Sequence, residues 1–315
     1  MIPENTGPGY LQLHATGALE ERADRAYRLL QACTVCPRRC GVNRLDDERG
    51  FCRTGLLPVI ASHGPHFGEE RPLVGRRGSG TIFVARCNMA CCFCQNFSIS
   101  RLGQGREATP AELAGIMLKL QEAGCHNINI VTPSHIVPQL IRGISIAAGK
   151  GLSIPVVYNS GGYDSMETLR LLDGVVDIYM PDAKYGSNRV ASLLSDAPDY
   201  VDVMQAAIRE MHRQVGDLVI RDGIAVRGLL VRHLVLPQNL AASDRILPWL
   251  AETVSRDTYV NIMDQYHWPG PQGLPESCRN DPIVDGLLRP VTPREFGDAI
   301  RWARAAGLHR GFPPS

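Results

Sequence analysis

The spacing of its cysteines constrains this chain more than any other feature of the sequence. Eight of the ten cysteines form two tight clusters: Cys33, Cys36, Cys40 and Cys52, followed by Cys87, Cys91, Cys92 and Cys94. Disulfide scaffolds are usually short secreted domains, whereas this chain has 315 residues, and its start, MIPENTGPGY, lacks the basic and apolar regions of a secretion signal. We therefore expect a cytoplasmic protein whose clustered thiols bind metal.

The second cluster predicts an iron-sulfur site. Cys87, Cys91 and Cys94 are spaced CxxxCxxC directly after the β-branched run TIFVAR. Three thiolates on such a loop can ligate three irons of a 4Fe-4S cluster and leave the fourth iron open to another ligand. We expect the extra cysteine, Cys92, to be a small buried hydrophobe. A four-cysteine zinc site is the competing interpretation, and adjacent Cys91 and Cys92 fit its tetrahedral geometry poorly.

The first cluster predicts a second metal site. Cys33 and Cys36 form a CxxC pair, Cys40 follows after three intervening residues, and Cys52 returns beside Gly50 in the sequence GFC. Four thiolates arranged in this way suit a closed zinc site or an auxiliary 4Fe-4S cluster. The spacing does not choose between the two.

Other residues of metal-binding types lack such spacing. His63 and His66 lie near Glu69 and Glu70 in ASHGPHFGEE, which we interpret as a turn. Cys125 follows Gly124 at the end of a predicted helix and is expected to be packed. Cys278 lies in the loop WPGPQGLPESCRNDP, which is expected to be an insertion or a lid.

Short apolar strands alternate with amphipathic helices along most of the chain. The predicted strands are 81–86, 127–131, 154–159, 176–182, 228–237 and 258–264, and the predicted helices are 17–32, 109–124, 136–149, 165–173, 188–214, 243–255 and 292–306. Such alternation indicates a parallel sheet with right-handed crossovers, and about six units are too few for a closed eight-unit barrel. The expected fold is α/β, a partial (β/α)6 TIM-like barrel.

The division predicted from this pattern places an N-terminal helix and cysteine-rich metal-binding segment at 1–75 and the barrel with its C-terminal helix at 76–315. Active sites of parallel barrels lie at the carboxyl ends of the strands. The expected strands end in CNMACCFC, TPSH, NSGGYD, PDAK, RHLVLP and DQYH. Polar chemistry is thus expected at that end of the barrel.

The sequence CxxxCxFC after the first strand resembles the signature of radical S-adenosylmethionine (SAM) enzymes, with Phe93 as the aromatic residue before the last cysteine. From TIFVARCNMACCFCQNFSIS to its end, the chain is most similar to the pyruvate formate-lyase-activating-enzyme-like group. The similarity extends upstream through CTVCPRRCGVNR. This resemblance implies a 4Fe-4S cluster whose open iron binds SAM, reductive cleavage of SAM to methionine and a 5'-deoxyadenosyl radical, and hydrogen abstraction from a substrate.

The resemblance also implies which residues contact SAM. PDAK resembles the DxK motif of glycyl-radical-enzyme activators and nominates Asp182 and Lys184, while Arg232 occupies the place of a basic residue directed toward methionine. DQYHWPG resembles the LPYHxxG pattern and nominates His267. Activators usually carry a GGE motif after the second strand, where this chain reads VTPSH, so Thr132, Ser134 and His135 are candidates to hold the amino group.

The resemblance implies activation of a glycyl radical enzyme or modification of a peptide, with reduced flavodoxin or ferredoxin as the electron donor. A small-molecule substrate is the alternative, and a non-catalytic iron-sulfur or zinc protein is the alternative of a different class. The chain has 33 Lys and Arg against 32 Asp and Glu. This balance gives no reason to expect nucleic acid, and no apolar run approaches the roughly 20 residues of a membrane span.

Overall fold

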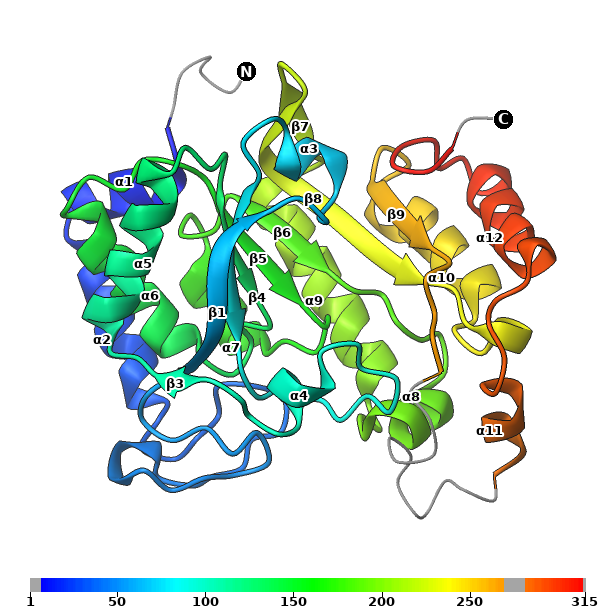
Figure 1. Ribbon diagram of the computed structural model, residues 1–315, viewed down its shortest axis with the longest axis horizontal. Coiled ribbons are helices and arrows are strands. Elements are labelled where there is room, and N and C mark those ends of the chain that lie inside the picture. Colours follow the sequence, from blue (N-terminus) through cyan, green and yellow to red (C-terminus); the bar gives the residue numbers. More distant parts are fainter. Residues whose placement is uncertain (1–6, 269–280, 314–315) are drawn as a thin grey trace.

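Six parallel strands form the centre of an open sheet in the computed structural model, which describes residues 7–268 and 281–313 (Figure 1). These strands are β2 (Ser79–Val84), β4 (Ile128–Val131), β5 (Val156–Ser160), β6 (Ile178–Pro181), β8 (Ile224–Leu234) and β9 (Tyr259–Met263), in that spatial order. The sheet does not close into a barrel. The expected number of parallel strands is confirmed, and the observed ends differ from the predicted ones by a few residues.

Three antiparallel strands extend the sheet, and the sequence analysis found none of them. They are β1 (Val59–His66), β3 (Arg106–Glu107) and β7 (Val219–Arg221). The interpretation of His63 and His66 as part of a turn was wrong, because both lie in β1, paired with Ile82 and Ser79 of β2. Strand β1 also joins part of the segment before residue 75 to the sheet; the division at that residue remains a prediction.

The helices largely follow the predicted positions. They are α1 (Gly9–Ala15), α2 (Ala18–Arg28), α3 (Arg71–Val74), α4 (Phe97–Ser100), α5 (Pro110–Glu122), α6 (Val137–Ala148), α7 (Met166–Leu172), α8 (Asn188–Ser195), α9 (Tyr200–Val215), α10 (Ser243–Trp249), α11 (Pro282–Gly286) and α12 (Pro293–Ala305). Short 3-10 turns cover Arg44–Asp46 and Pro237–Asn239, and a π-helical turn covers Leu250–Val254. Capping boxes start α5 at Thr109 and α12 at Thr292.

One predicted helix, 188–214, is two helices. Asp196 takes a left-handed conformation (φ 50°) after α8, and Pro198 follows before α9 begins. A proline disfavours helical geometry in the residue before it, so the chain turns between the two helices. Because of this turn, the main-chain oxygens of Leu194 and Ser195 accept hydrogen bonds from the cysteine-rich loop after β2.

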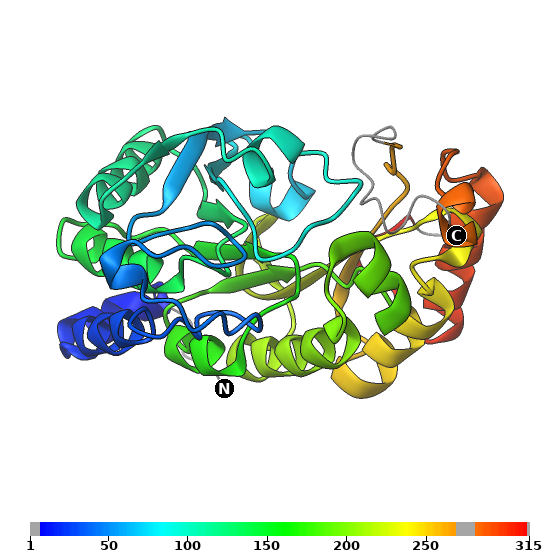
Figure 2. The same ribbon diagram turned by 90° about the horizontal axis from the view of Figure 1, so that it is seen from below.

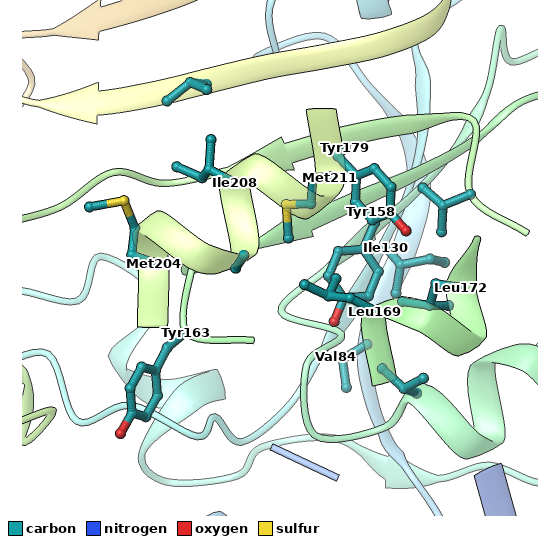
Figure 3. Close-up of a cluster of buried hydrophobic side chains, with 14 of the residues drawn as sticks. Val84, Ile130, Tyr158, Tyr163, Leu169, Leu172, Tyr179, Met204, Ile208 and Met211 are labelled. Carbon is teal, nitrogen blue, oxygen red and sulfur yellow. The ribbon is translucent and has the colours of Figure 1, made fainter. Parts of the chain in front are cut away.

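Helices cover the outer face of the sheet (Figures 1 and 2). Helix α6 packs between α2 and α5, and α9 packs on β6 and β8. Figure 3 shows the core between the sheet and its helices, where the rings of Tyr158 and Tyr179 meet edge to face at 5.7 Å. Their hydroxyls donate to Asp164 and Gln214, so both buried polar groups are satisfied.

The parallel strands bring their carboxyl ends to one edge of the sheet, and this arrangement positions the site described below. No helix within the described ranges has the length and apolar composition to cross a membrane.

His233 links β8 to the start of α10 beside this edge. Its Nδ1 donates to the Ala183 carbonyl at 2.6 Å, so its Nε2 is free to accept from the Ser243 hydroxyl at 2.7 Å. Burial lowers the pKa of His233 to about 4. The folded protein therefore holds this ring neutral across the physiological range.

This histidine predicts a pH dependence of stability. The unfolded chain protonates His233 near pH 6.5, so the stability that depends on the neutral ring is present above that pH. It is lost as the pH falls toward 4, by about 3 kcal/mol in total. The His233→Gln variant keeps a donor and an acceptor but does not titrate. Urea unfolding of both proteins should show their difference in unfolding free energy shrinking by that amount on acidification.

The difference in unfolding free energy between the two proteins isolates the effect of His233. Burial also lowers the pKa of His135, to about 3, but His135 is present in both proteins and its effect cancels. A difference that stayed constant between neutral and acidic pH would contradict a neutral buried ring at His233.

Candidate active site at the carboxyl ends of the parallel strands

A cavity of about 390 Å³ lies at the carboxyl ends of the parallel strands. Its walls include residues at or just after the ends of all six: Val84, Val131, Ser160, Asp182, Leu234 and Met263. Its volume is typical of a pocket for one small molecule. This position agrees with the place where parallel α/β sheets carry their binding sites.

The loop after β2 brings three cysteines to this cavity. Cys87, Cys91 and Cys94 border it, whereas Cys92 is buried at 1% exposure and does not. The loop is fixed by main-chain hydrogen bonds from Ala90 and Cys92 to the end of α8, and by the Asn88 side chain, which donates to the Tyr163 carbonyl at 2.7 Å. The three motif cysteines are thus gathered at one side of the cavity.

Each of these three sulfur atoms has a hydrogen-bond donor. The Ser195 hydroxyl donates to Cys91 at 2.9 Å, the Ser100 hydroxyl to Cys94 at 3.2 Å, and the Met89 amide to Cys87 at 3.4 Å. Burial raises the pKa of the Cys87 and Cys91 thiols, and the charge of Lys184 opposes that shift at Cys91. Donors and a nearby cation favour thiolates, the form in which cysteine binds metal.

The donor set fits a 4Fe-4S cluster held by three cysteines. Such a cluster takes soft thiolate ligands on separate corners and leaves one iron without a protein ligand. No group of three or more His, Cys, Asp or Glu side chains in residues 7–268 and 281–313 is already arranged to hold a single metal ion. The three thiols border a shared cavity with no fourth cysteine among its lining residues in the described structure.

A buried ion network forms another part of the cavity wall. Asp182 accepts a hydrogen bond of 2.8 Å from Arg232 Nε and also pairs with Lys184 Nζ. Burial opposes ionisation of Asp182, but the charges of Arg232 and Lys184 outweigh it and hold the pKa of Asp182 below its usual value. Two cations thus contact the single carboxylate of Asp182.

The structure brings most of the predicted SAM-contacting residues to this cavity. Phe93, Thr132, Asp182, Lys184, Arg232 and His267 all border it. Ser134 and His135 do not: the Ser134 hydroxyl is buried near Tyr158 and Asp164, and His135 Nε2 lies 3.1 Å from the Ala85 carbonyl oxygen. The roles of all these residues remain predictions. Cys278 and most of the predicted lid lie outside the described residues.

Sequence analysis did not assign Glu69, a second acidic residue, to this cavity. The side chain of Glu69 is 8% exposed and lies 4.0 Å from Arg232 Nη1 and 3.6 Å from His66 Nδ1. Burial raises its pKa despite these neighbours. His66 and Glu69 both border the cavity, but they come from the end of an antiparallel strand and the loop after it, which the sequence pattern did not reveal.

Two small residues, Gly161 and Gly162, follow β5 in the sequence NSGGYD, and Gly161 borders the cavity. Gly162 has φ 77°, and a Cβ there would lie 2.2 Å from the Asp182 carbonyl oxygen, so it serves close packing of two strand ends. Cys125 is buried at 3% exposure, as predicted.

Comparison with known proteins identifies a relative of this chain. No protein-family model matches the chain. It is 33% identical over 256 residues to the uncharacterized protein MJ0674 of Methanocaldococcus jannaschii, an alignment that covers 79% of this chain and 70% of that protein. The chain belongs to the same family as MJ0674.

One similarity among solved structures is weaker. The crystal structure of HydG, a maturase of the [FeFe]-hydrogenase, aligns with a TM-score of 0.47 and 14% sequence identity over 73% of this chain. The alignment covers 50% of the HydG chain, so this protein spans about half of its length. Values this low do not show a shared activity.

The cysteine geometry predicts different outcomes for neighbouring substitutions. Cys92→Ala should keep the iron and sulfide content and the visible absorbance of the anaerobically reconstituted protein, because Cys92 does not border the cavity. Cys91→Ala should lose most of both, because it removes one of three ligands. Iron and sulfide assays on the two purified variants make the comparison. Equal losses in both would contradict the assignment of Cys92.

Proposed function

We propose that this protein is a radical SAM enzyme that uses one electron to cleave SAM and abstracts hydrogen from a substrate. The observation that carries the proposal is that Cys87, Cys91 and Cys94 border the same cavity as the Asp182, Lys184 and Arg232 network. The motif provides three ligands for a cluster, and the cavity provides space and charge for a charged small molecule beside it.

In this proposal Cys87, Cys91 and Cys94 would hold a 4Fe-4S cluster. The cluster would supply the one electron needed to cleave a sulfonium C–S bond of SAM, which would give methionine and a radical able to take hydrogen from the substrate. The residues of this chain bind and orient. Lys184 and Arg232 can attract the methionine carboxylate, since Arg232 has further donors beyond the one bound to Asp182. Thr132 and the side chains of Asn159 and Ser160 border the cavity and offer oxygen acceptors for the ammonium group.

The charge balance of the network supports this assignment. Asp182 neutralises one of its two cationic neighbours, so a bound carboxylate would neutralise the other. Glu69 can balance an added ammonium or sulfonium charge, because its carboxylate lies 4.0 Å from Arg232 Nη1 and 3.6 Å from His66 Nδ1, beyond the distance of a direct hydrogen bond. A zwitterionic amino-acid group with an extra positive charge therefore matches the distribution of charge at the wall.

For the substrate we propose a protein backbone or peptide, including activation of a glycyl radical enzyme. A cavity of about 390 Å³ is filled largely by one molecule of drug-like size, so a second reactant would approach from the rim, where Gln95, Asn96 and His267 lie. A small-molecule metabolite is the alternative substrate. Reduced flavodoxin or ferredoxin is the proposed electron donor.

A non-catalytic iron-sulfur or zinc protein is the proposal of a different class. A cluster that only transfers electrons is usually ligated by four cysteines and has no need of a ligand cavity beside it. The cavity beside the three thiols therefore favours the enzyme.

The proposal predicts cleavage of SAM. Under strictly anaerobic conditions, the reconstituted protein with a strong one-electron reductant should release 5'-deoxyadenosine and methionine, measured by liquid chromatography. Lys184→Met should weaken SAM binding about tenfold or more, because it removes a buried cation from the site. Failure of the cluster-loaded, reduced protein to form 5'-deoxyadenosine under any substrate condition would overturn the proposal.

The matched control is Lys150→Met, which removes an exposed lysine at the turn after α6. It should leave SAM binding and cleavage unchanged. For the substrate, a partner enzyme deuterated at glycine should pass deuterium into 5'-deoxyadenosine and show a protein radical signal by electron paramagnetic resonance. Deuterium transfer from a labelled metabolite with no partner present would favour the small-molecule alternative.

A further inference from the structure

The four N-terminal cysteines gather around a second cavity, separate from the candidate active site. Cys33, Cys36, Cys40 and Cys52 all border it, together with Arg44 and His135. The fold thus joins thiols separated by up to nineteen residues in the sequence.

Local hydrogen bonds build this arrangement. The Cys33 amide donates to the Val42 carbonyl at 2.9 Å, and the Gly41 amide donates to the Cys33 carbonyl at 3.1 Å, which closes the turn that carries Cys36 and Cys40. The Phe51 amide points to Cys40 Sγ at 3.4 Å and brings the returning segment against that turn. Amide-to-sulfur contacts of this kind are typical of metal-binding knuckles.

Gly50 permits the closest approach in the cluster. A Cβ at this position would lie 2.6 Å from Cys40 Cβ and 2.7 Å from Cys40 Sγ. Both distances are far below van der Waals contact, so any larger residue would push the returning segment and Cys52 away from the turn. The sequence GFC therefore keeps Cys52 within reach of the other three thiols.

Arg44 supplies an observation independent of the cysteines. It is 1% exposed, its Nε donates to the Gly55 carbonyl at 3.0 Å, and its Nη1 donates to the His135 carbonyl at 2.8 Å. Nη1 also lies 3.9 Å from Cys33 Sγ. Nη2 is buried with no hydrogen-bond partner, and no carboxylate in the described part of the chain forms an ion pair with this guanidinium.

An unpaired buried cation is strongly unfavourable unless an anion compensates it. Four thiolates around zinc or around an oxidised 4Fe-4S core carry a net negative charge. Such a centre in the cavity that Arg44 borders would supply the missing anion. Neutral thiols would not, because they leave the charge of Arg44 without a counterpart.

We propose that Cys33, Cys36, Cys40 and Cys52 form a second metal centre, closed by four thiolates, with Arg44 as its buried counter-charge. The ligand chemistry is that of a thiophilic metal, either zinc or a 4Fe-4S cluster. Loading requires the side chains to rotate inward, and Cys40 and Cys52 retain the exposure to do so. The centre goes beyond the proposed enzymatic function and does not depend on it.

The test uses a full-length variant in which Cys87, Cys91 and Cys94 are all alanine. The variant is purified anaerobically, and separate samples are reconstituted with zinc or with iron and sulfide. Elemental analysis and a sulfide assay then give the metal and sulfide content of each sample. About one zinc per chain without sulfide indicates a zinc site, and about four irons with about four sulfides indicate a cluster. A folded variant, by circular dichroism, that binds neither would overturn the proposal.

Two further variants on the same background locate the metal. Adding Cys40→Ser should remove most of it, whereas adding Cys125→Ala, a buried cysteine outside both sets, should leave the content unchanged. If Cys40→Ser prevents folding, Arg44→Met gives the second measurement. The Arg44→Met variant keeps all four thiols. A chelator should remove its metal several-fold faster than it removes the metal from the same protein with Arg44 intact. Equal rates of loss, or metal retained in Cys40→Ser, would contradict the assigned site.

Discussion

The ion network at Asp182 connects the sheet to the site, and much of the cavity depends on it. Strands β6 and β8 pair at Ile178 and Tyr179 and then separate, until Asp182 and Arg232 form an isolated bridge beyond them. There the Ala183 amide donates a hydrogen bond of 2.8 Å to the Arg232 carbonyl, and the Arg232 side chain donates one to the Asp182 carboxylate. Removing Asp182 would leave the cations of Lys184 and Arg232 buried without the carboxylate that binds both, so the polarity of the wall is part of the fold.

The features that could be predicted from sequence are those with a local cause. Thr109, Pro110 and Glu112 specify the start of α5 with their own side chains and ring, and the same combination starts α12. The β-branched runs predicted all six parallel strands, and the polar residues after those runs predicted most of the cavity wall. Cys87, Cys91 and Cys94 could be grouped because one loop carries all of them.

The features that could not be predicted depend on contacts between distant segments. Glu69 reaches the cavity because β1 pairs antiparallel with β2, and the sequence GPHFGEE gives no periodic sign of a strand. The sequence did not distinguish Ser134 from Thr132, two residues earlier, as a candidate to hold the amino group. In the structure Thr132 has φ 65° and the chain turns there, so Ser134 is directed to the buried Asp164. Arg44 gave no signal at all, because its burial depends on the carbonyls of Gly55 and His135.

The open edge of the sheet has a consequence for how such a site can change. In a closed barrel the number of strands and their stagger fix the radius, so the interior cannot widen without altering the hydrogen-bond register. Here β2 and β9 are not paired in the described structure, and Phe83 of β2 and Met263 of β9 both border the cavity. Substitutions at such positions could widen or narrow the cavity while every ladder hydrogen bond is kept. Evolution could then adapt this scaffold to reactants of different size with single replacements.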